Sequence, residues 1–123
     1  MRTPVGVTRD GDAVAFVVKP CSARRIGTAR IYRNAEASGS TVWRARVLPD
    51  AAARREVPVR DAVPGYRVTT GARIAHTWPR FVPTSTRIVT ATIDDRRGVW
   101  LDDVTFAPAD ARRGRAFSEG ASV

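Results

Sequence analysis

The only histidine and the only cysteine are the residues with the widest range of possible chemistry. His76 lies close to Thr77 and Ser85, and a histidine whose ring is held by an aspartate can act as a general base toward a hydroxyl. Cys21 could be a nucleophile with the same histidine as its base. No motif surrounds either group, so we expect a solvated or hydrogen-bonded loop histidine and a buried, inert thiol. We predict no catalytic residues, and a small hydrolase is the last of three alternatives.

Metal ligands are too few for most sites. One cysteine and one histidine cannot complete a zinc site. Candidate oxygen ligands for calcium are Asp10, Asp12, Asp94, Asp95, Asp102 and Asp103. Their spacing matches no calcium loop, and aspartates at turns usually cap the backbone. We expect no metal and no cofactor, with calcium as the minor alternative.

A long segment without strand or helix pattern is the best binding candidate. The stretch GARIAHTWPRFVPTSTR covers residues 71–87, and long irregular loops in small domains are often functional. Its candidate partner-binding residues are Arg73, His76, Trp78, Arg80 and Phe81, whose types are common in interface hot spots. The alternative is that Trp78 and Phe81 fold back to cover an open end of the domain.

The charge balance favours anionic partners. The chain has 21 basic and 12 acidic residues, a net charge of +9, and Lys19 is its only lysine. Such a charge attracts anions in a salt-dependent way. The arginine-, alanine- and valine-rich composition is also typical of GC-rich coding, and there is no basic tail of the kind that binds phosphate backbones. Binding of nucleic acid or another polyanion is therefore our second hypothesis.

Short strands between turn signals account for most of the chain. The run 13–18 is apolar throughout, which indicates a central strand. In the stretch 41–48, Trp43, Ala45 and Val47 alternate with Arg44 and Arg46, as in a half-buried strand with a charged outer face. Further strands are predicted at 3–8, 25–33, 56–60, 66–70, 87–94 and 99–106. This pattern predicts an all-β, two-layer antiparallel sandwich, immunoglobulin-like, with seven to eight strands.

Turn residues connect the predicted strands. Pro64 and Gly65 suit the two central positions of a type II turn, so EVPVRDAVPGYRVTTG reads as a corner without chemistry. Tyr66 then starts a strand, where its hydroxyl can reach a backbone group. Asp10-Gly11 and Gly98 predict hairpins. The apolar pattern changes phase near Gly27, which predicts a bulge or bend.

The predicted core follows from the inward positions of these strands. It consists of Val14, Phe16, Val18, Ile31, Trp43, Val47, Val57, Val59, Tyr66, Val68, Ile88, Ala91, Ile93, Leu101, Val104 and Phe106. We expect one domain over residues 1–107 and a flexible tail over 108–123, which is polar and lacks periodicity.

Four of these stretches, AVAFVVKPC, TVWRARV, EVPV and VPGYRVTT, occur in an order that resembles a group of small β-sandwich proteins of GC-rich Gram-positive bacteria. The likeness covers residues 13–106. It implies the sandwich fold and no known activity, and the aromatic loop is longer here than in that group.

These observations favour a non-enzymatic module that binds another protein through the loop 73–87 or through an exposed strand edge. It could be a subunit of a complex, an immunity-type partner or an assembly component. No apolar run is long enough for a membrane span. The single cysteine favours the cytoplasm, and secretion after removal of a signal peptide is the alternative.

Overall fold

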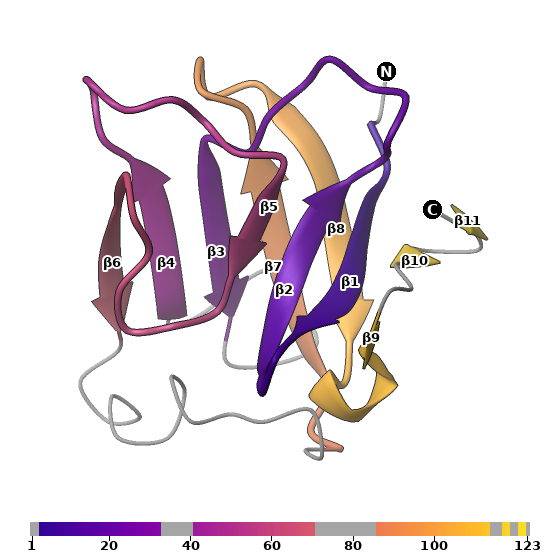
Figure 1. Ribbon diagram of the computed structural model, residues 1–123. Coiled ribbons are helices and arrows are strands. Elements are labelled where there is room, and N and C mark those ends of the chain that lie inside the picture. The colour runs from indigo at the N-terminus through magenta and orange to yellow at the C-terminus, as the bar shows by residue number, and fades with distance from the viewer. Residues whose placement is uncertain (1–2, 33–40, 71–85, 114–116, 119–120, 123) are drawn as a thin grey trace.

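A computed structural model describes residues 3–32, 41–70, 86–113, 117–118 and 121–122, and it shows an all-β sandwich (Figure 1). Its main strands are β1 (Val5–Asp10), β2 (Ala13–Val18), β3 (Thr28–Tyr32), β4 (Thr41–Val47), β5 (Glu56–Pro58), β6 (Tyr66–Thr70), β7 (Val89–Asp94) and β8 (Trp100–Phe106). The predicted two-layer antiparallel sandwich of about eight strands is confirmed. Its immunoglobulin-like character stays a prediction.

The two layers differ in size. The larger sheet has the order β6-β4-β3-β7-β8, and every neighbouring pair is antiparallel. The smaller sheet has the order β5-β2-β1, and the short β9 (Arg112–Arg113) adds to β1 in parallel. In Figure 1, β5, β2 and β1 form a layer in front of the larger sheet.

The chain continues past the expected domain boundary at residue 107. A 3₁₀ helix (Pro108–Asp110) follows, then β9, and then β10 (Phe117–Ser118) pairs with β11 (Ala121–Ser122). The division into a domain and a flexible tail stays a prediction. Within the described residues, no helix is long and apolar enough to cross a bilayer.

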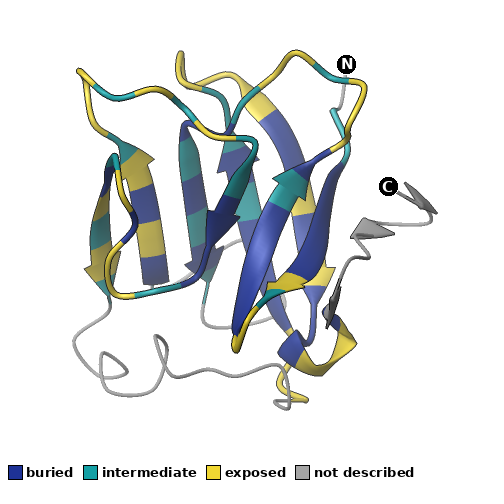
Figure 2. Cartoon of the chain, viewed as in Figure 1, coloured by how far each residue is buried: buried dark blue, intermediate teal, exposed yellow. Residues whose placement is uncertain are grey.

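The core lies between the facing sides of the two sheets. Phe16 on β2 packs against Trp43 on β4 with ring centroids 6.4 Å apart, and against Phe106 on β8 at 5.6 Å in an edge-to-face arrangement. The Trp43 side chain is completely buried, and its indole N–H donates to the carbonyl of Arg60 at 3.1 Å. From Trp43 to Arg46, buried and exposed residues alternate along β4 (Figure 2), as the period of two in the sequence predicts.

Most of the predicted core is confirmed, but the assignment of Ile88 is wrong. Its side chain is 56% exposed, because β7 begins at Val89 and Val89 takes the inward position. Val47 and Val68 are only partly buried at the side of the core. Core residues that the prediction missed are Val5, Val7, Ile26, Ala29, Val42, Ala45, Val63, Val89 and Ala111.

The predicted corner before β6 is confirmed. Gly65 has a φ of 82°, and the N–H of Tyr66 donates to the carbonyl of Val63 at 3.0 Å, as a type II turn requires. Gly11 and Gly98 also have positive φ values and lie in the β1–β2 and β7–β8 hairpins.

The predicted bend near Gly27 is where the chain passes from one sheet to the other. Ile26 forms an isolated bridge with Arg54 beside the smaller sheet, whereas the N–H of Gly27 donates to Asp94 of the larger sheet at 2.8 Å. A Cβ atom on Gly27 would lie 2.2 Å from the carbonyl oxygen of Asp95, so only glycine fits this crossing.

Candidate functional site

All five residues that the sequence proposes for partner binding fall outside the described residues. Arg73, His76, Trp78, Arg80 and Phe81 belong to the segment 71–85. Their role in partner binding stays a prediction.

Cys21 is exposed, which corrects the expectation of a buried thiol. Strand β2 ends at Val18, and the chain then turns, with the N–H of Ser22 donating to the carbonyl of Lys19 at 3.0 Å. The cysteine follows Pro20 on the outside of this turn, whereas the apolar run before it is what enters the core.

The aspartates act on the backbone and on neighbouring arginines. Asp95 accepts hydrogen bonds from the N–H groups of Arg97 and Val99, both at 2.9 Å, and pairs with Arg24 at 2.8 Å. The buried Asp102 accepts from the N–H of Val5 at 3.0 Å and so links β8 to β1. The capping role expected of turn aspartates is confirmed for Asp95. No group of three metal-binding side chains occurs among the residues that the structure describes.

The other aspartate pair lies at the β1–β2 hairpin. The Arg60 guanidinium lies 3.1 Å from a carboxylate oxygen of Asp12 and 3.9 Å from one of Asp10. These contacts tie the segment after β5 to the β1–β2 hairpin.

The outer face of the larger sheet gathers arginines from three adjacent strands. Arg46 on β4 lies directly opposite Arg67 on β6, and Arg44 on β4 lies opposite Arg30 on β3. Alternation in each strand turns all four side chains away from the core. We call Arg30, Arg44, Arg46 and Arg67 the basic half of this face.

The arginines of the basic half differ in their side-chain contacts. The Nε–H of Arg30 donates to the Thr41 hydroxyl, and its guanidinium lies 4.6 Å from the centre of the Tyr32 ring. The side chains of Arg46 and Arg67 make no hydrogen bond or ion pair with any described residue. Two like charges without an ion-pair partner among the described residues therefore lie side by side.

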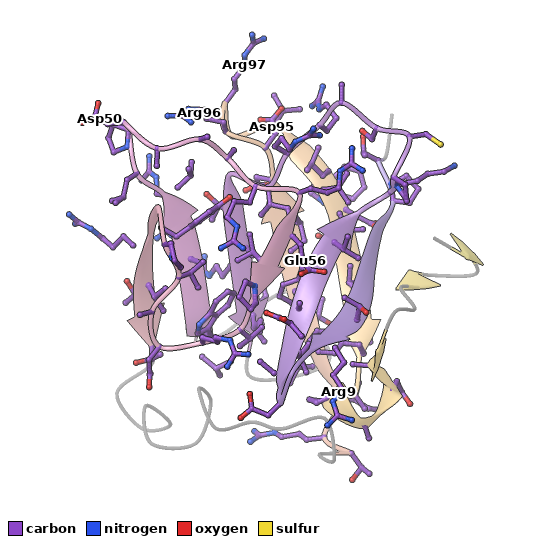
Figure 3. The ribbon with its side chains drawn as sticks, in the orientation of Figure 1. Arg9, Asp50, Glu56, Asp95, Arg96 and Arg97 are labelled. Atoms are coloured by element: carbon purple, nitrogen blue, oxygen red, sulfur yellow. The ribbon has the colours of Figure 1, made fainter. Side chains whose placement is uncertain are left out.

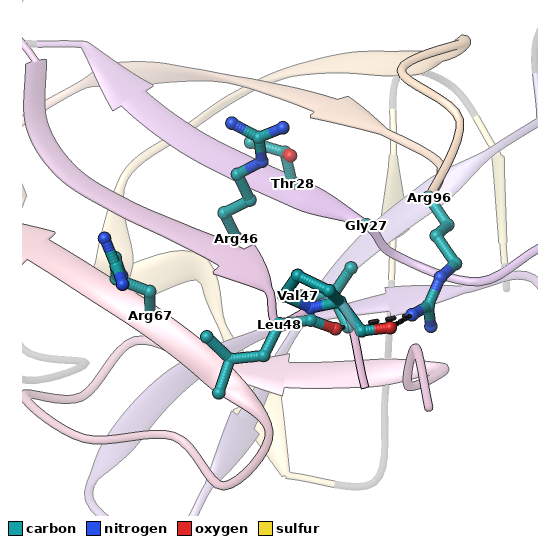
Figure 4. A pocket seen from close by; sticks show the side chains of 8 residues that line it. Gly27, Thr28, Arg46, Val47, Leu48, Arg67 and Arg96 are labelled. Carbon is teal, nitrogen blue, oxygen red and sulfur yellow. Dashed lines mark hydrogen bonds between the residues drawn. The ribbon is translucent and has the colours of Figure 1, made fainter. Parts of the chain in front are cut away.

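A hollow of about 390 Å³ opens at the end of the basic half (Figure 4). It is lined by Gly27, Thr28, Arg46, Val47, Leu48, Pro49, Arg67 and Arg96. Arg96 comes from the β7–β8 hairpin, and its guanidinium donates to the carbonyls of Leu48, Pro49 and Ala51. Figure 3 shows Arg96 at the same end of the molecule as Asp50, next to Asp95 and Arg97.

Two carboxylates occupy the other half of the same face. Asp94 on β7 lies across from Thr28 on β3, and Asp103 on β8 lies across from Thr92 on β7. Partial burial raises the pKa of Asp94, the charges of Asp103 and Asp95 raise it further, and Arg44 acts in the opposite direction. We call Asp94 and Asp103 the acidic strip. The face is thus positive over β6, β4 and β3 and negative over β7 and β8.

The sequence predicts only part of this surface. The alternation in residues 41–48 correctly turns Arg44 and Arg46 outward. Nothing local in the sequence indicates that Arg67 and Arg96 join them, because this depends on the pairing of β4 with β6 and on the position of the β7–β8 hairpin.

No family model, curated protein or solved structure matches the chain. The resemblance to small sandwich proteins of GC-rich Gram-positive bacteria stays a prediction.

Proposed function

We propose that this protein is a non-enzymatic module that binds another protein through the outer face of its larger sheet. An acidic surface of the partner lies over the basic half, and a basic group of the partner lies over the acidic strip. The observation behind this proposal concerns one regular surface: Arg46 and Arg67, whose side chains have no ion-pair partner among the described residues, share it with the half-buried Asp94 and the exposed Asp103. Such complementarity of charge gives specificity and fast association.

The acidic strip favours a protein partner over a nucleic acid. A nucleic acid presents the same negative charge along its whole length. Asp94 and Asp103 would repel it across part of the face. A protein surface can present both signs of charge, which suits a face divided in this way.

The described carboxylates give little support to an enzymatic role. Acid–base catalysis needs a titratable group that can reach a substrate. Asp95 and Asp102 instead hold backbone N–H groups, and Asp10 and Asp12 contact Arg60. These contacts give Asp10, Asp12, Asp95 and Asp102 structural roles.

Polyanion binding is the second candidate, and Arg30 supplies its specific observation. The stacked pair of Arg30 and Tyr32 is a group on which a base could stack. This candidate requires retention on heparin and on single-stranded DNA at low salt, with a steep loss as salt rises. Absence of binding at low salt would exclude it.

The first test is site-directed photo-crosslinking in cells that naturally produce the protein. A photoreactive amino acid at Thr92, between Arg30 and Asp103, should give one dominant protein adduct. The same amino acid at Ala62, in the exposed segment before β6, should not give it. Adducts of equal yield from both positions, or adducts that disappear with nuclease treatment, would contradict the proposal.

The second step identifies the contribution of the basic half. Arg44→Glu combined with Arg46→Glu should abolish the Thr92 adduct. Lys19→Glu combined with Arg97→Glu changes the net charge equally at exposed positions away from the face. This control pair should retain the adduct, and loss in both pairs would show that only net charge matters.

A further inference from the structure

We propose that the hollow between Arg46, Arg67 and Arg96 is a binding site for a small oxyanion, a carboxylate or phosphate attached to a short apolar body. This goes beyond the proposed function, because the ligand is a small group and needs no partner protein. Three features of the hollow support it: the charge of Arg46 and Arg67, the fixed position of Arg96, and the apolar part of the lining.

Two like charges lie next to each other at the hollow. Arg46 and Arg67 are direct neighbours across β4 and β6, and like charges in this position oppose strand pairing. No carboxylate is among the residues that line the hollow. An anion placed between the two guanidinium groups would remove this repulsion, and arginine suits it because its fork of N–H groups matches carboxylate and phosphate oxygens.

Arg96, the third arginine of the hollow, is held in place by the backbone. Arg96 uses three N–H groups on the carbonyls of Leu48, Pro49 and Ala51. A guanidinium has five N–H donors, so donors remain for a ligand. Because these bonds already hold the side chain at the rim of the hollow (Figure 4), little conformational entropy is lost when an anion binds.

Part of the lining of the hollow is apolar. Val47, Leu48 and Pro49 belong to the lining of the hollow, and Leu48 is 37% exposed. Burying such a surface favours a ligand with a few carbon atoms beside its charged group. A volume of about 390 Å³ lies within the usual range for small-ligand sites.

The test measures binding of four defined anions to the purified protein: inorganic phosphate, butyl phosphate, acetate and butyrate. Calorimetry and thermal unfolding are run at constant ionic strength, set with sodium chloride, so that general screening does not change. We expect saturable binding of butyl phosphate, at least threefold tighter than inorganic phosphate, or of butyrate, at least threefold tighter than acetate. The tighter of these two longer ligands then distinguishes phosphate from carboxylate chemistry.

Matched variants locate the binding. Arg46→Gln with Arg67→Gln should weaken binding at least tenfold and remove the ligand-induced rise in melting temperature. Lys19→Gln with Arg97→Gln, which removes the same charge elsewhere, should leave both unchanged. Arg67→Gln alone serves as a milder variant, and far-UV circular dichroism checks that each variant folds.

A structural readout completes the test. The Nε–H resonances of Arg46 and Arg67 in a ¹⁵N-correlated spectrum should shift with the same saturation curve as the calorimetry. The proposal is overturned if no anion binds saturably, if the control pair loses binding as strongly as the Arg46 and Arg67 pair, or if butyl phosphate binds no better than phosphate and butyrate no better than acetate. Each result is obtained without the partner protein, so it is independent of the proposed function.

Discussion

Arg46 and Arg67 lie directly opposite each other on β4 and β6, and no described residue offers either side chain a hydrogen bond or an ion pair. Cross-strand neighbours of like charge lower the stability of a sheet. The fold therefore tolerates a local electrostatic cost at the surface where an anionic partner or ligand would remove it.

Replacing one of these arginines by an acid should stabilise the free protein. Arg67→Glu converts the repulsive pair into an attractive one, and we expect a gain of about 0.5 kcal/mol in the free energy of unfolding at low salt. The gain should shrink at high salt, because the pair is exposed. Urea denaturation at both salt concentrations measures it, and a loss of stability at low salt would contradict the expected repulsion.

The hydroxyl of Tyr66 joins the two sheets where the chain crosses between them. It accepts from the N–H of Arg54 at 2.8 Å and donates to the carbonyl of Ile26. Tyr66→Phe leaves both backbone groups without this partner, and we expect a loss of about 1 to 3 kcal/mol in urea denaturation. Tyr32→Phe is the matched control, and a similar loss in both variants would refute this role of the Tyr66 hydroxyl.

Local patterns predict the turns and the faces of the strands, whereas the neighbours of each strand depend on distant pairing. Pro64-Gly65 forms a turn because those two residues alone supply its backbone angles. Arg46 faces outward because of alternation within β4. The position of Arg67 beside it follows from the register of two strands joined by a long excursion through β5 in the other sheet. Ile88 was misplaced because strand ends are not fixed by periodicity alone.

Gly27 should tolerate no side chain. In Gly27→Ala, the new Cβ would meet the carbonyl of Asp95 at 2.2 Å, and neighbouring backbone would have to move. We expect a loss of more than about 2 kcal/mol, or failure to fold. At Gly98 a Cβ meets nothing within 4 Å. Gly98→Ala should therefore lose only about 1 kcal/mol of stability, because alanine disfavours the positive φ at this position. Thermal unfolding of both variants compares them, and equal losses would contradict the close approach at Gly27.

Glu56 should lower stability as it ionises. Partial burial raises its pKa, the charge of Asp10 adds to this, and Arg54 opposes it (Figure 3 shows the position of Glu56). The folded protein therefore holds the Glu56 proton more tightly than the unfolded chain. Stability from this group is full below the usual pKa of glutamate and is lost as pH rises through the raised value.

The corresponding variant removes this dependence. Glu56→Gln should melt at a higher temperature than the unaltered protein at pH 7, and the difference should shrink toward zero near pH 4. Asp61→Asn changes an exposed carboxylate and should show no such trend. A difference for Glu56→Gln that is constant between pH 4 and 7 would contradict the effect of burial on Glu56.

The divided charge of the outer face is tested most directly by neutralising its acidic strip and measuring the affinity for the crosslinked partner. Asp94→Asn with Asp103→Asn makes the face more positive. If a protein with both signs of charge binds there, this double variant should bind at least fivefold more weakly, as should Arg44→Gln with Arg46→Gln. Tighter binding by the aspartate double variant would instead indicate a uniformly negative partner and contradict the account.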